Sequence, residues 1–282
     1  MSPNVVSFFH RKSGTLSYLV HDGKKALIID PVIDLDLASG RLSSAPSDEI
    51  LTQVKTLGLS VAWIVETHAH ADHLTGGDYL RRQLGAPLGI GRGIRNVQGT
   101  FEPVFEMTSA DTERAFDRLF EDGDELKIGD MNVRVMATPG HTDDSVTYIV
   151  GDAAFVGDTL FAPTRGTARC DFPGGSATEL FATIHKLYAL PETTRLFLCH
   201  DYPPRDEPPL VSATVQTQRE QNAHVTSTTT EAAFVELRET RDATLSMPAL
   251  IIPALQVNIR GGALPDAASN GTTYLKLPLN RL

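Results

Sequence analysis

Four short apolar segments of this chain each end, within a few residues, in a histidine or an aspartate. The segments are rich in β-branched and apolar residues and are bounded by Gly, Pro, Asp or Thr, which is typical of buried strands. Ligands bind beyond the carboxyl ends of strands in layered α/β folds, so we expect these polar residues to converge. The segments and the residues that follow them are 61–65 with His68, His70, Asp72 and His73; 133–137 with His141; 153–156 with Asp158; and 196–199 with His200.

Helix-like segments lie between the strand-like ones. A further strand is expected at 26–29, and the helical patterns fall at 48–57, 77–84, 178–189 and 210–222. This interleaving predicts a layered α/β architecture. The turn sequence Glu-Asp-Gly-Asp at 121–124 predicts a hairpin, which would make the sheets mixed.

The pattern changes after His200. Thr228 and Glu231 have the spacing of a capping box, which predicts a helix through about residue 240, followed by a proline-punctuated tail over 247–265. We therefore expect a catalytic domain over residues 1–205 and a C-terminal extension over 206–282 that packs on it.

Charge and composition narrow the classes of partner. The formal net charge is -10 and no run of Lys or Arg exceeds two residues, which argues against a nucleic-acid-binding protein. No apolar run is long enough to span a membrane and no secretion signal is visible, so we expect a cytoplasmic protein. In a reducing compartment Cys170 and Cys199 are expected to be free thiols.

The segment 68–73 places three histidines and one aspartate within six residues. Alternate residues of an extended loop project the same way, so His68 and His70 can face one ion while Asp72 and His73 face a second. Imidazole and carboxylate ligands suit zinc, iron or manganese. A single histidine at a strand end is usually incidental. Three histidines and one aspartate within six residues, followed in order by His141, Asp158 and His200, predict a metal site.

Four motifs resemble the signature of the metallo-β-lactamase superfamily. They are the sequence THAHADHLTG at 67–76, TPGHT at 138–142, the Gly-Asp pair at 157–158, and His200. The resemblance covers about residues 5 to 205. It implies a four-layer αββα sandwich with mixed sheets and a metal site at one rim of the sheets.

Within the superfamily, softer motifs resemble the persulfide dioxygenases, also called sulfur dioxygenases. These are Arg-Cys-Asp-Phe at 169–172, Cys-His-Asp-Tyr at 199–202, and Arg219 in a later helix. The glyoxalase II family usually has Arg-x-Phe-Glu and His-Glu-Tyr at the first two places. The aspartates at 171 and 201 therefore favour the dioxygenases.

The resemblance implies one Fe(II) per chain, held by His68, His141 and Asp158. Two histidines and one carboxylate leave open positions for oxygen and substrate. The residues that would line the site without holding iron are His70, Asp72, His73 and His200. The same residues could instead hold the second metal of a two-metal hydrolase, and the motifs leave both arrangements open.

The implied substrate is glutathione persulfide, which O2 would oxidise to sulfite and glutathione. Glutathione carries two carboxylates that an arginine can pair with in a two-pronged way, so Arg169 and Arg219 are candidates for substrate binding, with Tyr202 as a hydroxyl donor. Arg219 could equally belong to a solvated helix face. Cys170 has no histidine base nearby in the sequence, so we interpret it as structural rather than nucleophilic.

Several alternatives stay open. The segment 202–209 resembles an insertion near the substrate entrance, so coenzyme A persulfide, another small persulfide or a polysulfide could replace the glutathione form. The principal alternative function is a dinuclear zinc thioester hydrolase of the glyoxalase II type. A nuclease or a metal-free binding module fits the residues less well. The dioxygenase resemblance also implies persulfide supply by a separate rhodanese or by diffusion, and is compatible with a homodimer.

Overall fold

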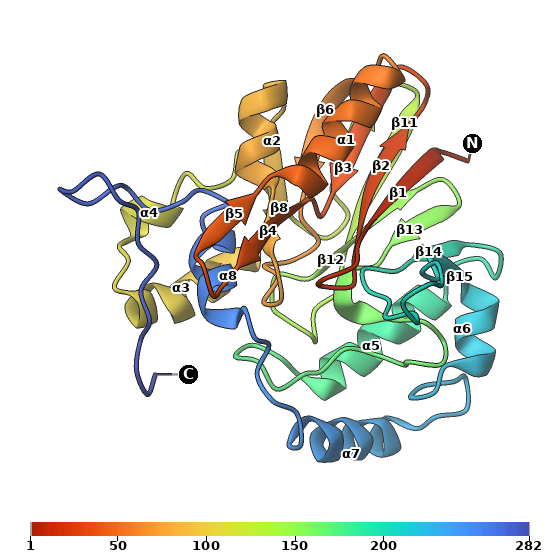
Figure 1. Ribbon diagram of the computed structural model, residues 1–282. Helices are drawn as coiled ribbons and strands as arrows, with labels where there is room; N and C mark the ends of the chain where they lie inside the picture. The colour runs from red at the N-terminus through yellow and green to blue at the C-terminus, as the bar shows by residue number, and fades with distance from the viewer. Residues whose placement is uncertain (1, 282) are drawn as a thin grey trace.

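Two six-stranded β-sheets face each other in the computed structural model, which describes residues 2–281, and helices cover their outer faces (Figure 1). In spatial order, the first sheet contains β1 (Asn4–His10), β2 (Thr15–His21), β3 (Lys25–Ile29), β6 (Ser60–Val65), β8 (Leu88–Gly91) and β9 (Arg118–Phe120). The second contains β10 (Glu125–Ile128), β11 (Met131–Ala137), β12 (Val146–Val150), β13 (Ala153–Phe155), β14 (Arg195–Phe197) and β15 (Ser212–Thr214). A small third sheet contains β5 (Arg41–Ser43), β4 (Val32–Asp36) and β7 (Leu74–Thr75).

Both large sheets are mixed. The pairs β3–β6, β6–β8, β8–β9 and β13–β14 are parallel, whereas the other pairs of these sheets are antiparallel. Parallel neighbours need long crossover connections, and the chain supplies helices for several of them. The predicted αββα sandwich with mixed sheets is confirmed.

The helices form the two outer layers. Those packed on the first sheet are α1 (Ala45–Thr56), α2 (Gly77–Leu84), α3 (Ile94–Phe105) and α8 (Ile251–Asn258). Those packed on the second are α5 (Ala177–Tyr188), α6 (Val215–Gln221) and α7 (Glu231–Asp242). Two short helices, α4 (Ser109–Thr112) and the 3-10 helix η1 (Gly157–Thr159), lie in connections. None of the helices within residues 2–281 is long and apolar enough to cross a membrane.

An aromatic cluster fills part of the space between the sheets. The ring of Tyr18 lies 5.0 Å from that of Phe155 and 5.4 Å from that of Phe197, and the two phenylalanine rings stack 4.8 Å apart. The Tyr18 hydroxyl donates to the carbonyl oxygen of Leu198, so its polar end is also satisfied. Burying a side chain of this size contributes about 1.5–3 kcal/mol, and this cluster therefore helps to hold the two sheets together.

The hairpin predicted at 121–124 is wrong. β9 belongs to the first sheet and β10 to the second, so the turn carries the chain from one sheet to the other. It is anchored to β11, because the N–H of Gly123 donates to the Val135 carbonyl and the N–H of Val135 donates to the Asp124 carbonyl. A tight turn uses the same residue types whether its flanking strands pair with each other or enter different sheets. The turn residues alone therefore could not show that β9 and β10 are in different sheets.

Two C-terminal elements also differ from prediction. The helix predicted at 210–222 begins only at Val215, because residues 212–214 form the edge strand β15, and Thr214 caps the helix by accepting a hydrogen bond from the Thr217 N–H. The cap of α7 is Thr230 rather than Thr228. The tail over 247–265 contains α8, in which Pro253 is tolerated because N–H groups of a first turn have no intrahelical acceptor.

A buried ion pair fixes helix α7 to the rest of the protein. Arg238 and Asp242, one turn apart, are 1% and 4% exposed and bond to each other. Asp242 Oδ2 also accepts a hydrogen bond of 2.8 Å from the N–H of Cys170, and Arg238 donates to the Thr167 carbonyl at 3.2 Å. The pair therefore joins α7 to the segment 167–170.

Replacing Arg238 with alanine should lower the free energy of unfolding by about 3–5 kcal/mol, because the buried Asp242 charge loses its partner. Urea unfolding measures this loss. The control is Arg219→Ala, since the pair between Arg219 and Glu192 is partly exposed, and exposed pairs contribute about 1 kcal/mol or less. Equal losses in the two variants would contradict the importance of the buried pair.

Candidate metal centre

Side chains from three separate segments meet at one rim of the sheets. His68 follows β6, His141 follows β11, and Asp158 lies in η1 after β13. One ligand atom of each lies within 4.8 Å of the others. Asp158 Oδ2 is 3.9 Å from His68 Nε2 and 3.7 Å from His141 Nε2. Two imidazoles and one carboxylate are a donor set that suits non-haem iron.

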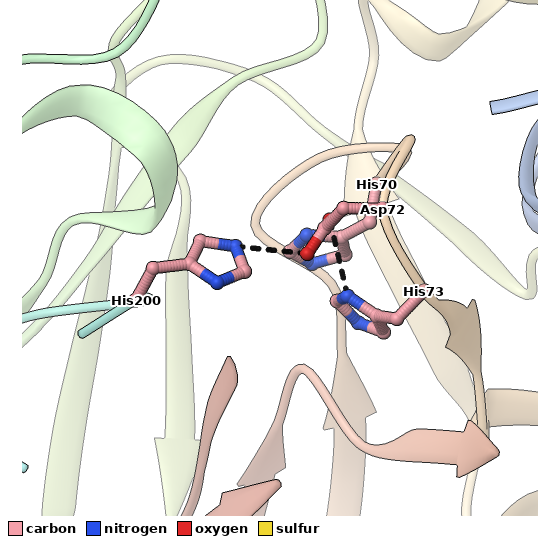
Figure 2. Close-up of side chains that lie close together, drawn as sticks. All are labelled: His70, Asp72, His73 and His200. Atoms are coloured by element: carbon pink, nitrogen blue, oxygen red, sulfur yellow. Dashed lines mark hydrogen bonds and ion pairs between the residues drawn. The ribbon is translucent and has the colours of Figure 1, made fainter. Parts of the chain in front are cut away.

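A second group, drawn in Figure 2, adjoins the first and consists of His70, Asp72, His73 and His200. The Asp72 carboxylate lies between two imidazoles, 3.2 Å from His73 Nδ1 and 3.5 Å from His200 Nε2. His200 Nε2 is also 3.2 Å from Asp158 Oδ1, so the two groups meet there. The structure thus brings together the seven residues that the sequence predicts for a metal site.

Hydrogen bonds leave the Nε2 atoms of two histidines free to bind a metal. His141 Nδ1 lies 2.7 Å from the Arg169 carbonyl oxygen, which can only accept, so Nδ1 carries the proton. Thr67 Oγ1 donates to Asp30 Oδ2 at 2.9 Å, and it can therefore accept from His68 Nδ1 at 3.1 Å. Such partners fix both the tautomer and the orientation of a ligand histidine.

Several ligand-type atoms at this rim are buried without a hydrogen-bond partner among residues 2–281. They are His68 Nε2, His70 Nδ1, His73 Nε2, His200 Nε2, Asp72 Oδ2 and Asp158 Oδ1. Each buried polar atom left without a partner costs about 1–3 kcal/mol, so a cluster of them is costly. A bound cation would satisfy them, and nitrogen and carboxylate donors fit iron or zinc.

Burial and charge set the protonation of the cluster. Burial and the neighbouring histidines lower the pKa of His68 well below its usual value and lower the pKa of His73 to about 4. Burial acts in the same direction on His70, but the Asp30 carboxylate outweighs it and raises the pKa of His70 to about 10. Burial alone would raise the pKa of Asp72, yet the adjacent histidines lower it. His68 and His73 are therefore neutral and Asp72 ionised at pH 7, as metal binding requires. His70, in contrast, would have to lose a proton before it could bind a metal.

Two glycines let the ligand segments approach their neighbours closely. Gly140, directly before His141, has a φ of 131°, and a Cβ at this position would lie 2.3 Å from the backbone nitrogen of Leu180. Gly157, directly before Asp158, has a φ of 53°, and its Cβ would lie 2.7 Å from Thr67 Oγ1. Any other residue would push the following ligand away from the rim.

Buried carboxylates hold the loop that carries the first histidines. Asp30 Oδ1 accepts a hydrogen bond of 2.7 Å from the Thr67 N–H, and Asp144 Oδ2 accepts one of 2.7 Å from the Ala69 N–H. Both carboxylates are almost completely buried. They fix the backbone on either side of His68.

Asn258, at the end of α8, is a site residue that sequence analysis missed. Its side-chain amide donates to the carbonyl oxygens of His70 at 2.7 Å and His73 at 2.8 Å, and its amide oxygen accepts from the Thr75 N–H at 2.9 Å. All three bonds fall on the segment 67–75, called the ligand loop below, which includes the short strand β7, so Asn258 fixes its shape. The available signal was a pair of polar residues, Gln256 and Asn258, within an apolar helix, because buried polar side chains require specific partners.

A cavity of about 320 Å³ opens beside the two ligand groups. His141, Asp158 and His200 form part of its wall, so a small molecule in the cavity would reach the metal site. The aromatic and cationic residues that also line it are Phe161, Phe172, Tyr202, Arg165, Arg169, Arg238 and Arg241. Such a wall suits an anionic molecule with apolar parts.

Two of the residues predicted to bind substrate line this cavity. Arg169 is held by Asp171, with two nitrogen-to-oxygen distances of 2.6 Å, and its guanidinium lies 4.8 Å from the centre of the Phe172 ring. The ring of Tyr202 stacks parallel to that of His200 at 6.1 Å, and Tyr202 is 55% exposed. The charge of Arg169 is therefore already paired, whereas Tyr202 is accessible.

Arg219, the third predicted substrate-binding residue, is placed elsewhere. It lies in the last turn of α6, where it pairs with Glu192, and it does not line the cavity. Helix α6 turns this side chain toward the loop after α5, so the structure does not bring Arg219 to the cavity, and its substrate role stays a prediction.

Both cysteines are buried and free, as predicted. Burial raises the pKa of the Cys170 thiol to about 12, and burial also raises that of Cys199 well above its usual value. A thiolate is the reactive form of cysteine, so neither residue is suited to act as a nucleophile at neutral pH.

Replacing Asn258 with alanine should weaken metal binding by about 10–100-fold, because the ligand loop loses three hydrogen bonds. Competition with a metal-ion indicator measures the affinity. The matched control is Gln256→Ala, which also removes buried amide bonds from α8, but bonds to Ile252 and Lys276 rather than to the ligand loop. Similar metal affinity in both variants would contradict the role given to Asn258.

Removal of metal by a chelator should lower the melting temperature, because the buried donors are then unpaired. A cation present at 100 times its Kd stabilises a protein by about 2.7 kcal/mol. Differential scanning calorimetry with and without chelator measures the shift, and a His68→Ala variant should show a smaller one. An unchanged melting temperature of the unsubstituted protein would count against the metal site.

Comparisons with known proteins identify the family of this chain. The family model described as Metallo-beta-lactamase superfamily matches residues 11–200. A beta-lactamase hydrolase-like protein of Xylella fastidiosa is 46% identical over 100% of this chain, but the chain spans only 66% of that protein's length. Glyoxylase B2 of Dictyostelium discoideum is 42% identical, covering 96% of this chain and 94% of that protein.

Two further comparisons concern persulfide dioxygenases. The mitochondrial persulfide dioxygenase ETHE1 of Homo sapiens is 32% identical, covering 92% of this chain and 89% of that protein. The crystal structure of ETHE1 from Myxococcus xanthus superimposes with a TM-score of 0.73 at 28% identity, covering 93% of this chain and 100% of that one. With its αββα sandwich and its cluster of histidines and aspartates at the rim, the chain belongs to the metallo-β-lactamase superfamily.

Proposed function

We propose that this enzyme is a persulfide dioxygenase that oxidises glutathione persulfide with O2 at a single non-haem Fe(II). The observation that carries the proposal is the convergence of His68, His141 and Asp158, whose ligand atoms lie within 4.8 Å of one another beside a cavity. Two histidines and one carboxylate hold iron while leaving positions for O2 and substrate. The human persulfide dioxygenase at 32% identity supports the same reaction.

The proposed reaction converts one persulfide, one O2 and one water into glutathione, sulfite and two protons. The sulfur–sulfur bond breaks, and the outer sulfur leaves as sulfite. The persulfide sulfurs together lose four electrons, which O2 accepts. When bound, Fe(II) would supply the redox chemistry that lets O2 react with the persulfide anion.

The residues of the chain would orient the ligands and the substrate. The Arg169 carbonyl holds the proton on His141 Nδ1, which directs Nε2 toward Asp158. Phe161 and Phe172 border the cavity next to the ligands and would restrict the entry of water. Tyr202, exposed at the cavity, would donate a hydrogen bond from its hydroxyl group to the substrate.

The second candidate is a dinuclear zinc hydrolase of thioesters such as acylglutathiones. The observation that favours it is the second group, His70, Asp72, His73 and His200, whose ligand atoms also lie within 4.8 Å of one another. A second metal there would generate a hydroxide for attack on a carbonyl. The name of the relative Glyoxylase B2 is in line with this chemistry.

Protein purified without oxygen and loaded with Fe(II) should consume O2 and release one sulfite for each glutathione persulfide. Iron content is measured on the same sample and should be one per chain. His141→Ala should abolish both iron binding and oxygen uptake, because it removes one of three ligands. His73→Ala should still bind one iron, since His73 belongs to the second group.

The hydrolase predicts the opposite pattern. Two zinc ions per chain, hydrolysis of an acylglutathione and no oxygen uptake with any persulfide would overturn the dioxygenase proposal. In that case His73→Ala should reduce the metal content from two ions to one and abolish hydrolysis.

A further inference from the structure

The arginines that line the cavity fall into two classes. Arg169 is paired with Asp171 and the buried Arg238 with Asp242, so both guanidinium groups already have a carboxylate partner within the protein chain. Arg165 and Arg241 line the same cavity and are exposed, and neither has an ion-pair partner among residues 2–281. The cavity therefore presents two unpaired guanidinium groups.

These two guanidinium groups come from different segments of the chain. Arg165 lies in the loop after η1 and uses one nitrogen to donate to the Tyr202 carbonyl at 3.2 Å, which leaves its other donors available. Arg241 lies in the last turn of α7, and its side chain makes no hydrogen bond to any described residue. A positive charge at the end of a helix is common on structural grounds alone. Here, however, the residue also lines the cavity beside the metal site.

Unpaired positive charge beside the metal site is notable because the protein as a whole is acidic. With a net charge of -10, the protein as a whole repels an anion. Asp72 and Asp158 are the acidic residues that line the cavity, and both belong to the candidate ligand groups, where a cation would offset their charge. Arg165 and Arg241 are thus the cationic groups of the cavity wall that an anionic molecule could pair with.

We propose that Arg165 and Arg241 form a carboxylate-binding subsite for the thiol carrier of the persulfide. The inference rests on the proposed dioxygenase function and names how its substrate is selected. A guanidinium pairs with a carboxylate through two parallel hydrogen bonds, and glutathione offers two carboxylates. Phe161 and Leu245, which also line the cavity, would cover the apolar parts of the peptide. The subsite thereby replaces Arg169 and Arg219 as the source of free positive charge.

Isothermal titration calorimetry with S-methylglutathione tests the subsite without relying on oxygen chemistry. The metal-loaded protein should bind this probe, and Arg165→Gln and Arg241→Gln should each weaken binding by about tenfold or more, as expected for a lost charged hydrogen bond. The diethyl ester of S-methylglutathione, which lacks both carboxylates, should bind all forms equally weakly. The matched control is Arg134→Gln, because Arg134 is an exposed residue of β11 that does not line the cavity.

The outcomes separate the subsite from the reaction. Wild-type affinity in Arg165→Gln and Arg241→Gln, or equal affinity for the probe and its diester, would overturn the subsite even if the protein oxidises glutathione persulfide. Arginine-dependent binding of the probe without oxygen uptake would support the subsite and refute the dioxygenase. Thermal unfolding of each variant checks that lost binding does not reflect lost folding.

Discussion

The buried carboxylate of Asp30 is the interaction on which the metal centre depends. One oxygen accepts the Thr67 N–H and lies 3.2 Å from His70 Nε2, and the other accepts the Thr67 hydroxyl, which in turn orients His68. A single side chain therefore sets the direction of His68 and His70, the first two histidines of the motif. Asp30 adopts a φ of 49°, which is unfavourable for a residue with a Cβ and costs about 1–3 kcal/mol. The surrounding sheets supply the stability that offsets this strain.

The C-terminal part of the chain completes the site rather than merely covering the sandwich. Asn258 binds the ligand loop, and Asp242 binds the Cys170 N–H, next to the Arg169 carbonyl that orients His141. The Asn258 contact supports the group that contains His70, and the Asp242 contact supports the group that contains His141. The domain boundary expected near residue 205 stays a prediction, but both ligand groups have supporting contacts from beyond it.

The sequence predicted those features that depend on local spacing. The strand ends that carry His68, His141 and Asp158 and the helix at 77–84 were predictable, because periodicity is a local property. The sandwich was implied by the resemblance of the motifs to a known superfamily. Which strands pair is not local, so the turn at 121–124 was misassigned. The orientation of Arg219 depends on how α6 packs, and the contact of Asn258 joins residues 188 positions apart. Residue spacing could predict neither the orientation of Arg219 nor the contact of Asn258. The cost of burying an unpaired amide indicates only that a buried Asn258 must have hydrogen-bond partners.

The bond between Asn258 and His73 links positions 185 residues apart, and this distance has a consequence for biosynthesis. A ribosome that has already produced every candidate ligand has still to produce the helix that clamps the ligand loop. During that interval the nascent polypeptide presents its histidines on a loop that lacks this clamp. The full metal affinity of the centre is therefore expected only after α8 has docked on this loop.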